Sequence, residues 1–127
     1  IGRCGMSLST RKLSGQLSIF RFEEPLANAT KKTIDASTYT VSAIDQVFID
    51  NTANTHEGFL KIFNSSDVSL GSVDPYARMH CPAGKSKHYT FTGFALTACT
   101  FVVTKEAIAT TNTDPDTPVP VVLLASD

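Results

Sequence analysis

The sequence predicts an all-β fold, a single β-sandwich or jelly-roll-like barrel of about seven or eight mostly antiparallel strands. Short apolar or β-branched runs recur along the chain and are separated by turn-forming clusters, which is the pattern of successive strands. No long stretch has apolar residues at the spacing of an amphipathic helix. The chain has 127 residues, enough to bury one core without a metal or disulfide staple.

Three segments are expected along the chain. Residues 1–16 are rich in Ser, Thr and Gly and predict an extended N-terminal arm, either a loose terminus or a segment that orders on a neighbouring subunit. Residues 17–109 hold the β-sandwich. Residues 110–127 combine a Pro-rich link with an apolar stretch, which predicts a C-terminal strand or docking tail.

The individual strands follow from β-prone composition and from alternation of apolar and polar residues. The Asn-rich turn at 51–55 predicts a hairpin between the strands on either side of it. Residues 23–37 contain Pro25 and are expected to form a loop, and 105–109 is long enough for one helical turn. The expected strands are 17–22, 46–50, 58–64, 76–81, 86–92, 97–104 and 119–124, with a short edge strand within 33–39.

The composition argues against several classes of partner. Charged residues make up 18% of the chain, hydrophobic residues 42%, and the formal net charge is -1. Because phosphate binding needs a basic excess, we expect neither nucleic acid nor an anionic membrane as a partner. No apolar run approaches the length of a membrane span. A weakly charged surface is more compatible with a protein partly covered by another protein.

The cysteines and histidines predict no metal centre. Cys4, Cys81 and Cys99 form neither an even framework nor a CxxC pair; a Cys81–Cys99 bridge is compatible with the sequence, but we expect buried free thiols. His80 and Cys81 are adjacent in a strand and therefore point to opposite faces. His80 and His88 are expected to face outward and to pair across a hairpin, without a third ligand.

No catalytic signature accompanies the polar turn residues. His56 and His88 are the candidates for acid–base chemistry, but no motif such as GxSxG is present. Asp114 and Asp116 offer too few oxygens for Ca²⁺ and lack the EF-hand pattern. We therefore expect no enzyme, no catalytic residue, no metal and no cofactor, and a small hydrolase is the weakest alternative.

A family resemblance begins at FLKIFN (59–64) and CPAG (81–84), and continues through GF (93–94) to CTFVVT (99–104). This series resembles small β-rich virion structural proteins of tailed bacteriophages, in which a similar "LKIY … PAG … F … G … VT" sequence recurs. The resemblance covers about residues 47–103. Residues 76–80 depart from it, because YARMH stands where the family has a more aliphatic strand.

The resemblance implies a structural protein at the capsid surface of a virion, specifically a decoration or cement protein that bridges neighbouring shell subunits. Its implied partners are the major capsid protein or other virion proteins, and the implied state is a homo-oligomer, with a trimer as one form. The alternative is a fibre, tail or receptor-binding β-module that recognises a glycan, with Tyr76 or Tyr89 at an exposed rim.

Partner contacts are expected at both ends of the chain and on the second face of the strand at 58–64. The arm before residue 17 and the tail after Pro118 supply basic and apolar side chains, and two phenylalanines mark the second face. The candidate partner-binding residues are Arg11, Lys12, Leu13, Phe59, Phe63, Val121, Val122, Leu123 and Leu124.

Overall fold

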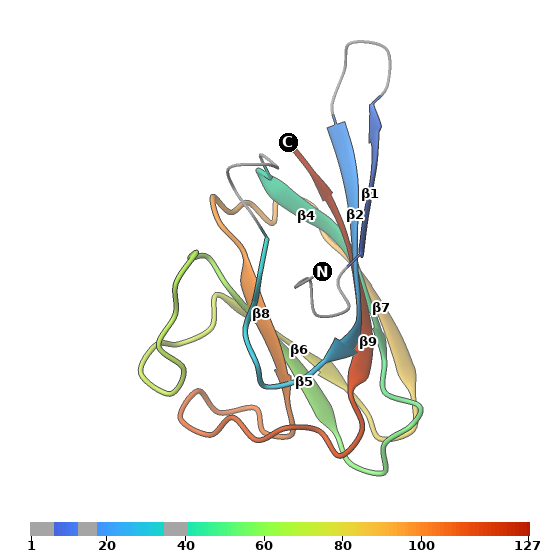
Figure 1. The fold of residues 1–127 in the computed structure, drawn as a ribbon, viewed down its shortest axis with the longest axis vertical. Coiled ribbons are helices and arrows are strands. Elements are labelled where there is room, and N and C mark those ends of the chain that lie inside the picture. Colours follow the sequence, from blue (N-terminus) through green and yellow to red (C-terminus); the bar gives the residue numbers. More distant parts are fainter. Residues whose placement is uncertain (1–6, 13–17, 35–40) are drawn as a thin grey trace.

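The computed structural model describes residues 7–12, 18–34 and 41–127, and these residues form nine β-strands (Figure 1). All the strand pairs are antiparallel. The strands are β1 (Ser7–Lys12), β2 (Ser18–Ala27), β3 (Lys32–Thr33), β4 (Ala43–Asp50), β5 (Gly58–Phe63), β6 (Ala77–Cys81), β7 (Ser86–Thr90), β8 (Thr100–Thr104) and β9 (Val119–Ser126).

The strand pairing is that of a jelly roll. Strand β2 pairs with β9, β3 with β8, β4 with β7 and β5 with β6, so the chain from β2 onward is one long hairpin folded over on itself. This folding yields a five-stranded sheet in the order β1-β2-β9-β4-β7 and a four-stranded sheet in the order β3-β8-β5-β6. The predicted all-β sandwich or jelly-roll-like barrel is therefore confirmed.

The core lies between the two sheets and is built from alternate residues of their strands. Val47 and Ile49 of β4 point inward from the five-stranded sheet, while Leu60 and Ile62 of β5 point inward from the four-stranded sheet. Met79 and Cys81 of β6 are buried as the alternation predicts. Each fully buried aliphatic side chain of this kind contributes about 1.5–3 kcal/mol relative to its exposed state.

The expected hairpin between 46–50 and 58–64 is wrong, because β4 and β5 belong to different sheets. The Asn-rich turn is present, but it carries the chain across the core instead of back along the same sheet. Strand β4 pairs with β9 and β7, which are distant in sequence. The inward faces of β4 and β5 are equally apolar in either arrangement, so alternation alone does not distinguish them.

The predicted loop at 23–37 is also wrong over its first part, since β2 continues to Ala27. The strand passes Pro25 by a register shift between Glu24 and Ala27. Glu24 is fully buried there, and its Oε2 accepts a hydrogen bond from the Leu26 N–H at 3.1 Å. A bulge of this kind allows a proline, which has no N–H, inside a paired strand. The expected helical turn at 105–109 is absent; these residues form bends and turns.

The expected arm and tail both contain strands of the five-stranded sheet. Within the arm, Ser7–Lys12 forms β1, which pairs with the first half of β2 in a hairpin that extends beyond the sandwich (Figure 1). The remaining arm residues, Leu13 among them, lie outside the described part of the chain. At the other end, Val119–Ser126 forms β9 between β2 and β4, so the tail is a central strand of its own domain.

The outer faces of the two sheets differ in their covering. Segments 64–76 and 105–118 fold over the four-stranded sheet, where Phe63 packs with Val68 and Val102. Lys61 is 0% exposed on this face, and its Nζ donates to the carbonyl oxygens of Ile108 at 2.8 Å and Thr111 at 3.1 Å. Asn112 Oδ1 accepts a third bond at 3.0 Å. The lysine thus ties the covering segment to the sheet.

Two buried asparagines hold the loops together at one end of the sandwich. Asn51 Nδ2 donates to the His56 carbonyl at 2.8 Å and also reaches the carbonyls of Cys81 and Pro82. Asn54 Nδ2 donates to Asn51 Oδ1 at 2.9 Å, which links the two amides. Together they connect the turn after β4 to the turn between β6 and β7.

Asn54 extends this network to the segment before β9. Its Nδ2 donates to the Thr117 carbonyl and its Oδ1 accepts from the Thr117 N–H, both at 2.8 Å. Lys105 Nζ contacts Asp116 Oδ1 at 2.6 Å nearby. Three loops that are far apart in sequence are therefore fixed to one another by buried polar contacts.

Cys81 and Cys99 are free and buried, as predicted. Burial raises the pKa of the Cys99 thiol to about 12, and burial also raises the pKa of Cys81. Because the thiolate is the reactive form, both should resist alkylation in the folded protein. In a Cys4→Ser variant we expect modification by a thiol reagent at pH 8 to be at least ~100-fold slower than in denaturant. Rapid modification of one thiol in the native protein would contradict this burial.

Candidate interaction surface

The outer face of the five-stranded sheet has an apolar centre. Val122 of β9 lies between Glu23 of β2 and Phe48 of β4, and Leu124 lies one step along between Arg21 and Gln46. Phe48 is 37% exposed, and Ile19, on the same face of β2, is 36% exposed. Polar residues of β7 border the centre on one side: Ser86, His88 and Thr90.

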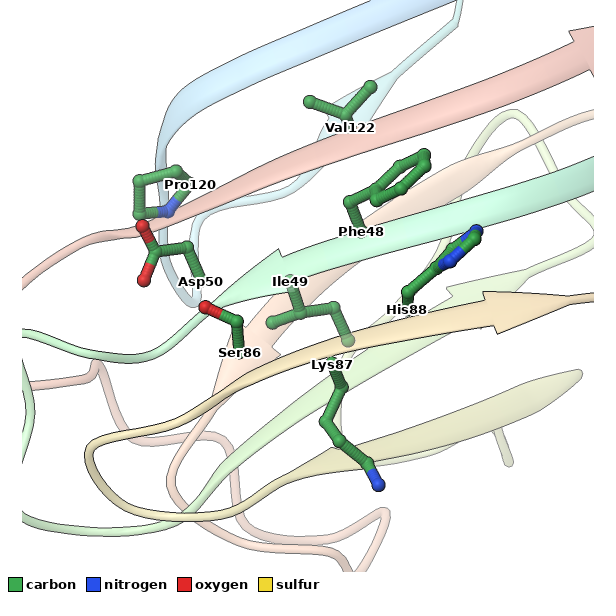
Figure 2. A pocket seen from close by; sticks show the side chains of 8 residues that line it. All are labelled: Phe48, Ile49, Asp50, Ser86, Lys87, His88, Pro120 and Val122. Carbon is green, nitrogen blue, oxygen red and sulfur yellow. The ribbon is translucent and has the colours of Figure 1, made fainter.

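A hollow of about 430 Å³ lies on this face, over the ends of β4, β7 and β9 (Figure 2). Phe48 and His88 stack in parallel, with ring centroids 4.1 Å apart and an interplanar angle of 8°. Pro120 and Asp50 gather at the end of the hollow, whereas the Lys87 amine points away from it (Figure 2). The hollow is open and is lined mostly by apolar atoms.

The charged groups around the apolar centre, and the His88 and Gln46 side chains, already have partners within the chain. Arg21 forms an ion pair with Glu23 at 3.2 Å, and His88 Nε2 lies 2.8 Å from Gln46 Oε1. Asp50 Oδ1 accepts from the backbone N–H of Thr52 at 3.0 Å, and hydrogen bonds from Thr52 hold the pKa of Asp50 below its usual value. A partner would therefore contact mainly apolar surface on this face, bordered by polar side chains that are paired within the chain.

The structure divides the expected partner-binding residues between the two sides of β9. Val122 and Leu124 lie on the outer face and are half-buried. The prediction is wrong for Val121 and Leu123. They are 1% and 0% exposed and pack into the core, so no partner reaches them in this fold. A strand alternates its side chains, so four consecutive apolar residues cannot all face a partner.

On the second face of β5, the prediction is wrong for Phe63, whereas Phe59 stays a prediction. Phe63 is buried beneath the chain's own segment 64–76, and Phe59 is half-buried with its ring 5.1 Å from that of His80. Arg11 and Lys12 belong to β1, where Arg11 lies opposite Ile19 in register; their side chains lie outside the described part of the structure, as does Leu13.

The histidines do not converge on a site. His80 contacts Glu57 at 2.8 Å and lies on β6, whereas His88 lies on β7 of the other sheet, so the expected pairing across a hairpin is wrong. His56 Nδ1 lies 2.8 Å from the Glu57 carbonyl, and its Nε2 accepts the Asp116 N–H at 3.1 Å. Across residues 7–12, 18–34 and 41–127, no group of three or more His, Cys, Asp or Glu could hold a metal ion.

Sequence reasoning missed Phe48 as the exposed centre of the surface. Its signal was the alternation of 46–50, which places Phe48 opposite to Val47 and Ile49 and hence outside the core. An aromatic residue on the outer side of a central strand is unusual unless that side is covered. Within the described residues there is no helix long and apolar enough to cross a membrane.

Comparison with known proteins identifies no family for the chain. No family model and no curated protein matches it. Among solved structures, the coat protein of Tobacco streak virus is similar, with 10% sequence identity and a TM-score of 0.40 over 97% of this chain and 86% of that chain. That protein comes from a plant virus and not from a tailed bacteriophage. A likeness of this degree transfers no residue role.

Proposed function

We propose that this chain is a structural protein of a virus particle and that the outer face of its five-stranded sheet is an assembly interface. Jelly rolls occur in viral capsid proteins, and also in lectins and cupins, so the fold alone does not select a function. The observation that carries the proposal is the apolar face around Phe48 and Val122, which no segment among the described residues covers, whereas the other sheet is covered.

This face has the composition of a protein interface. An apolar centre is surrounded by a polar border, and the charged groups of the border are paired within the chain. Interfaces between proteins have this arrangement, with charge depleted at the centre and aromatic residues enriched. Phe48 is the aromatic side chain at that centre, and its stacking on His88 holds it in one orientation before a partner binds.

In its finer form, the proposal is a decoration or cement protein on the capsid surface of a tailed bacteriophage, bound to the major capsid protein and acting without catalysis. The support is the resemblance of residues 47–103 to such proteins. Contacts that are modest individually but repeated over a shell would stabilise it by avidity. A homo-oligomer would multiply the contacts each unit makes.

The proposal is tested on particles that have been stripped of this protein. We expect stripped particles to lose their DNA at a lower temperature, and the added wild-type chain to restore their resistance. A Phe48→Lys variant should bind stripped particles at least ~100-fold more weakly, because it places an unpaired charge at the apolar centre.

Val73→Lys is the matched control, since Val73 is an exposed valine on segment 64–76 over the other sheet. It should bind as the wild type does, and thermal melting of each variant confirms that it is folded. Equal binding by Phe48→Lys, or particles that contain none of this chain, would rule out the proposed interface or the proposed role, respectively.

A glycan-binding module is the second candidate, because the hollow combines an exposed aromatic ring with Asp50 and Ser86. Against it, Asp50 already accepts hydrogen bonds from Thr52. Tyr76 is 52% exposed, but its hydroxyl donates to the Ala95 carbonyl at 2.6 Å. Binding on a glycan array that is lost in Phe48→Ala would favour this candidate.

A further inference from the structure

We infer that the occupant of this face is a second copy of the same chain, bound face to face. The twofold axis that relates the copies lies between their two five-stranded sheets and runs across the strands. The inference rests on the proposed function and deepens it by naming the partner. It follows from the residues in two neighbouring levels of the sheet, where a level is a row of outward-facing residues that lie side by side on β2, β9 and β4.

The two levels carry opposite charges at corresponding positions. One level holds Arg21, Leu124 and Gln46, and the next level holds Glu23, Val122 and Phe48. A twofold axis that runs across the strands between these levels stacks each strand on the same strand of the second copy. It also places the Arg21 level of one copy over the Glu23 level of the other. The stacking of two sheet faces is a standard packing in proteins.

Under this symmetry the face is complementary to itself. Arg21 of each copy meets Glu23 of the other, so the ion pair that now lies within one chain at 3.2 Å can form between chains. Val122 meets Leu124, so apolar side chains cover each other at the centre, and Phe48 meets Gln46, whose amide is already paired with His88. Each of these three contacts occurs twice, as an isologous contact requires.

Other classes of occupant fit the face less well. A nucleic acid or an anionic membrane needs a basic surface, whereas the described charges of this face are Arg21, Glu23 and Asp50. A small polar ligand needs unpaired donors and acceptors, whereas Asp50, His88 and Gln46 at the border of the centre are already paired. The net charge of -1 leaves little repulsion between two copies.

The experiment is sedimentation equilibrium of the full chain over a range of concentrations. We expect a wild-type dimer. Val122→Lys should raise its dissociation constant at least ~100-fold, because each copy then places an unpaired ammonium over Leu124. Arg21→Glu should raise the constant about 10-fold, and adding Glu23→Arg to it should restore the constant to within about 3-fold of wild type.

Val73→Lys serves as control and should leave the dimer unchanged. A wild-type chain that stays monomeric up to about 1 mM, a trimer, or a dimer insensitive to Val122→Lys would each overturn the inference. A monomer whose particle binding still depends on Phe48 would overturn the inference alone. A dimer of the expected sensitivity that is absent from particles would instead overturn the proposed function.

Discussion

Replacement of Asn51 by Asp is expected to lower the free energy of unfolding by about 3 kcal/mol or more. The substitution keeps the shape and the Oδ1 acceptor but removes Nδ2, which serves the carbonyls of His56, Cys81 and Pro82. It also places a buried negative charge against these oxygens. Asn51 is 0% exposed, so water cannot replace the lost donor without opening the loops.

Asn64→Asp is the matched control for this measurement. Asn64 is exposed, and its Oδ1 accepts from the N–H groups of Thr97 and Ala98, an acceptor role that Asp retains. Chemical denaturation should therefore show a change within about 0.5 kcal/mol for Asn64→Asp. Similar losses for the two variants would mean that the buried network does not hold the end of the sandwich together.

Replacement of Lys61 by Met is expected to cost about 2 kcal/mol and to loosen segment 105–118 before the sheets separate. Methionine retains most of the buried chain of Lys61 but leaves the oxygens of Ile108, Thr111 and Asn112 without their shared donor. We expect faster hydrogen exchange in that segment, with β5 itself little changed. Unchanged exchange in the segment would contradict the role given to the lysine.

The pH dependence of this effect has a defined sign. Burial lowers the pKa of Lys61 from its usual value of 10.5. The unfolded chain then holds the proton more tightly than the folded one, so the contribution of Lys61 to stability rises as pH rises from the folded pKa toward 10.5. The stability difference between wild type and Lys61→Met should widen over that range. A difference that stays constant or narrows over that range would contradict this sign.

The sequence predicts strands well where alternation is local. The inward face of β6 and the free buried cysteines follow from neighbouring residues alone. The sheet assignment of β4 and β5 does not, because it depends on pairing with β7 and β9 farther along the chain. Pro25 misleads for a related reason, since a proline that ends most strands is accepted where β2 bulges.

The candidate surface could be predicted only in part. Val122 and Leu124 were expected from their apolar character. The same reasoning included Val121 and Leu123, which are buried in the core. Phe63 was expected on an open face because the sequence does not indicate that segments 64–76 and 105–118 fold back over it. Lys61 lies between two phenylalanines on that face. A lysine at such a position needs acceptor oxygens, and this was the signal that another segment covers it.

The most direct test of the central claim is hydroxyl-radical footprinting of this chain, read by mass spectrometry, both in particles and as the free chain diluted until it is monomeric. If the outer face of the five-stranded sheet is the assembly interface, oxidation of Phe48 and His88 should fall about 10-fold or more in particles. Tyr76, at the border of the four-stranded sheet, should serve as the internal reference and change little. Unchanged oxidation of Phe48 in the particle would contradict the account.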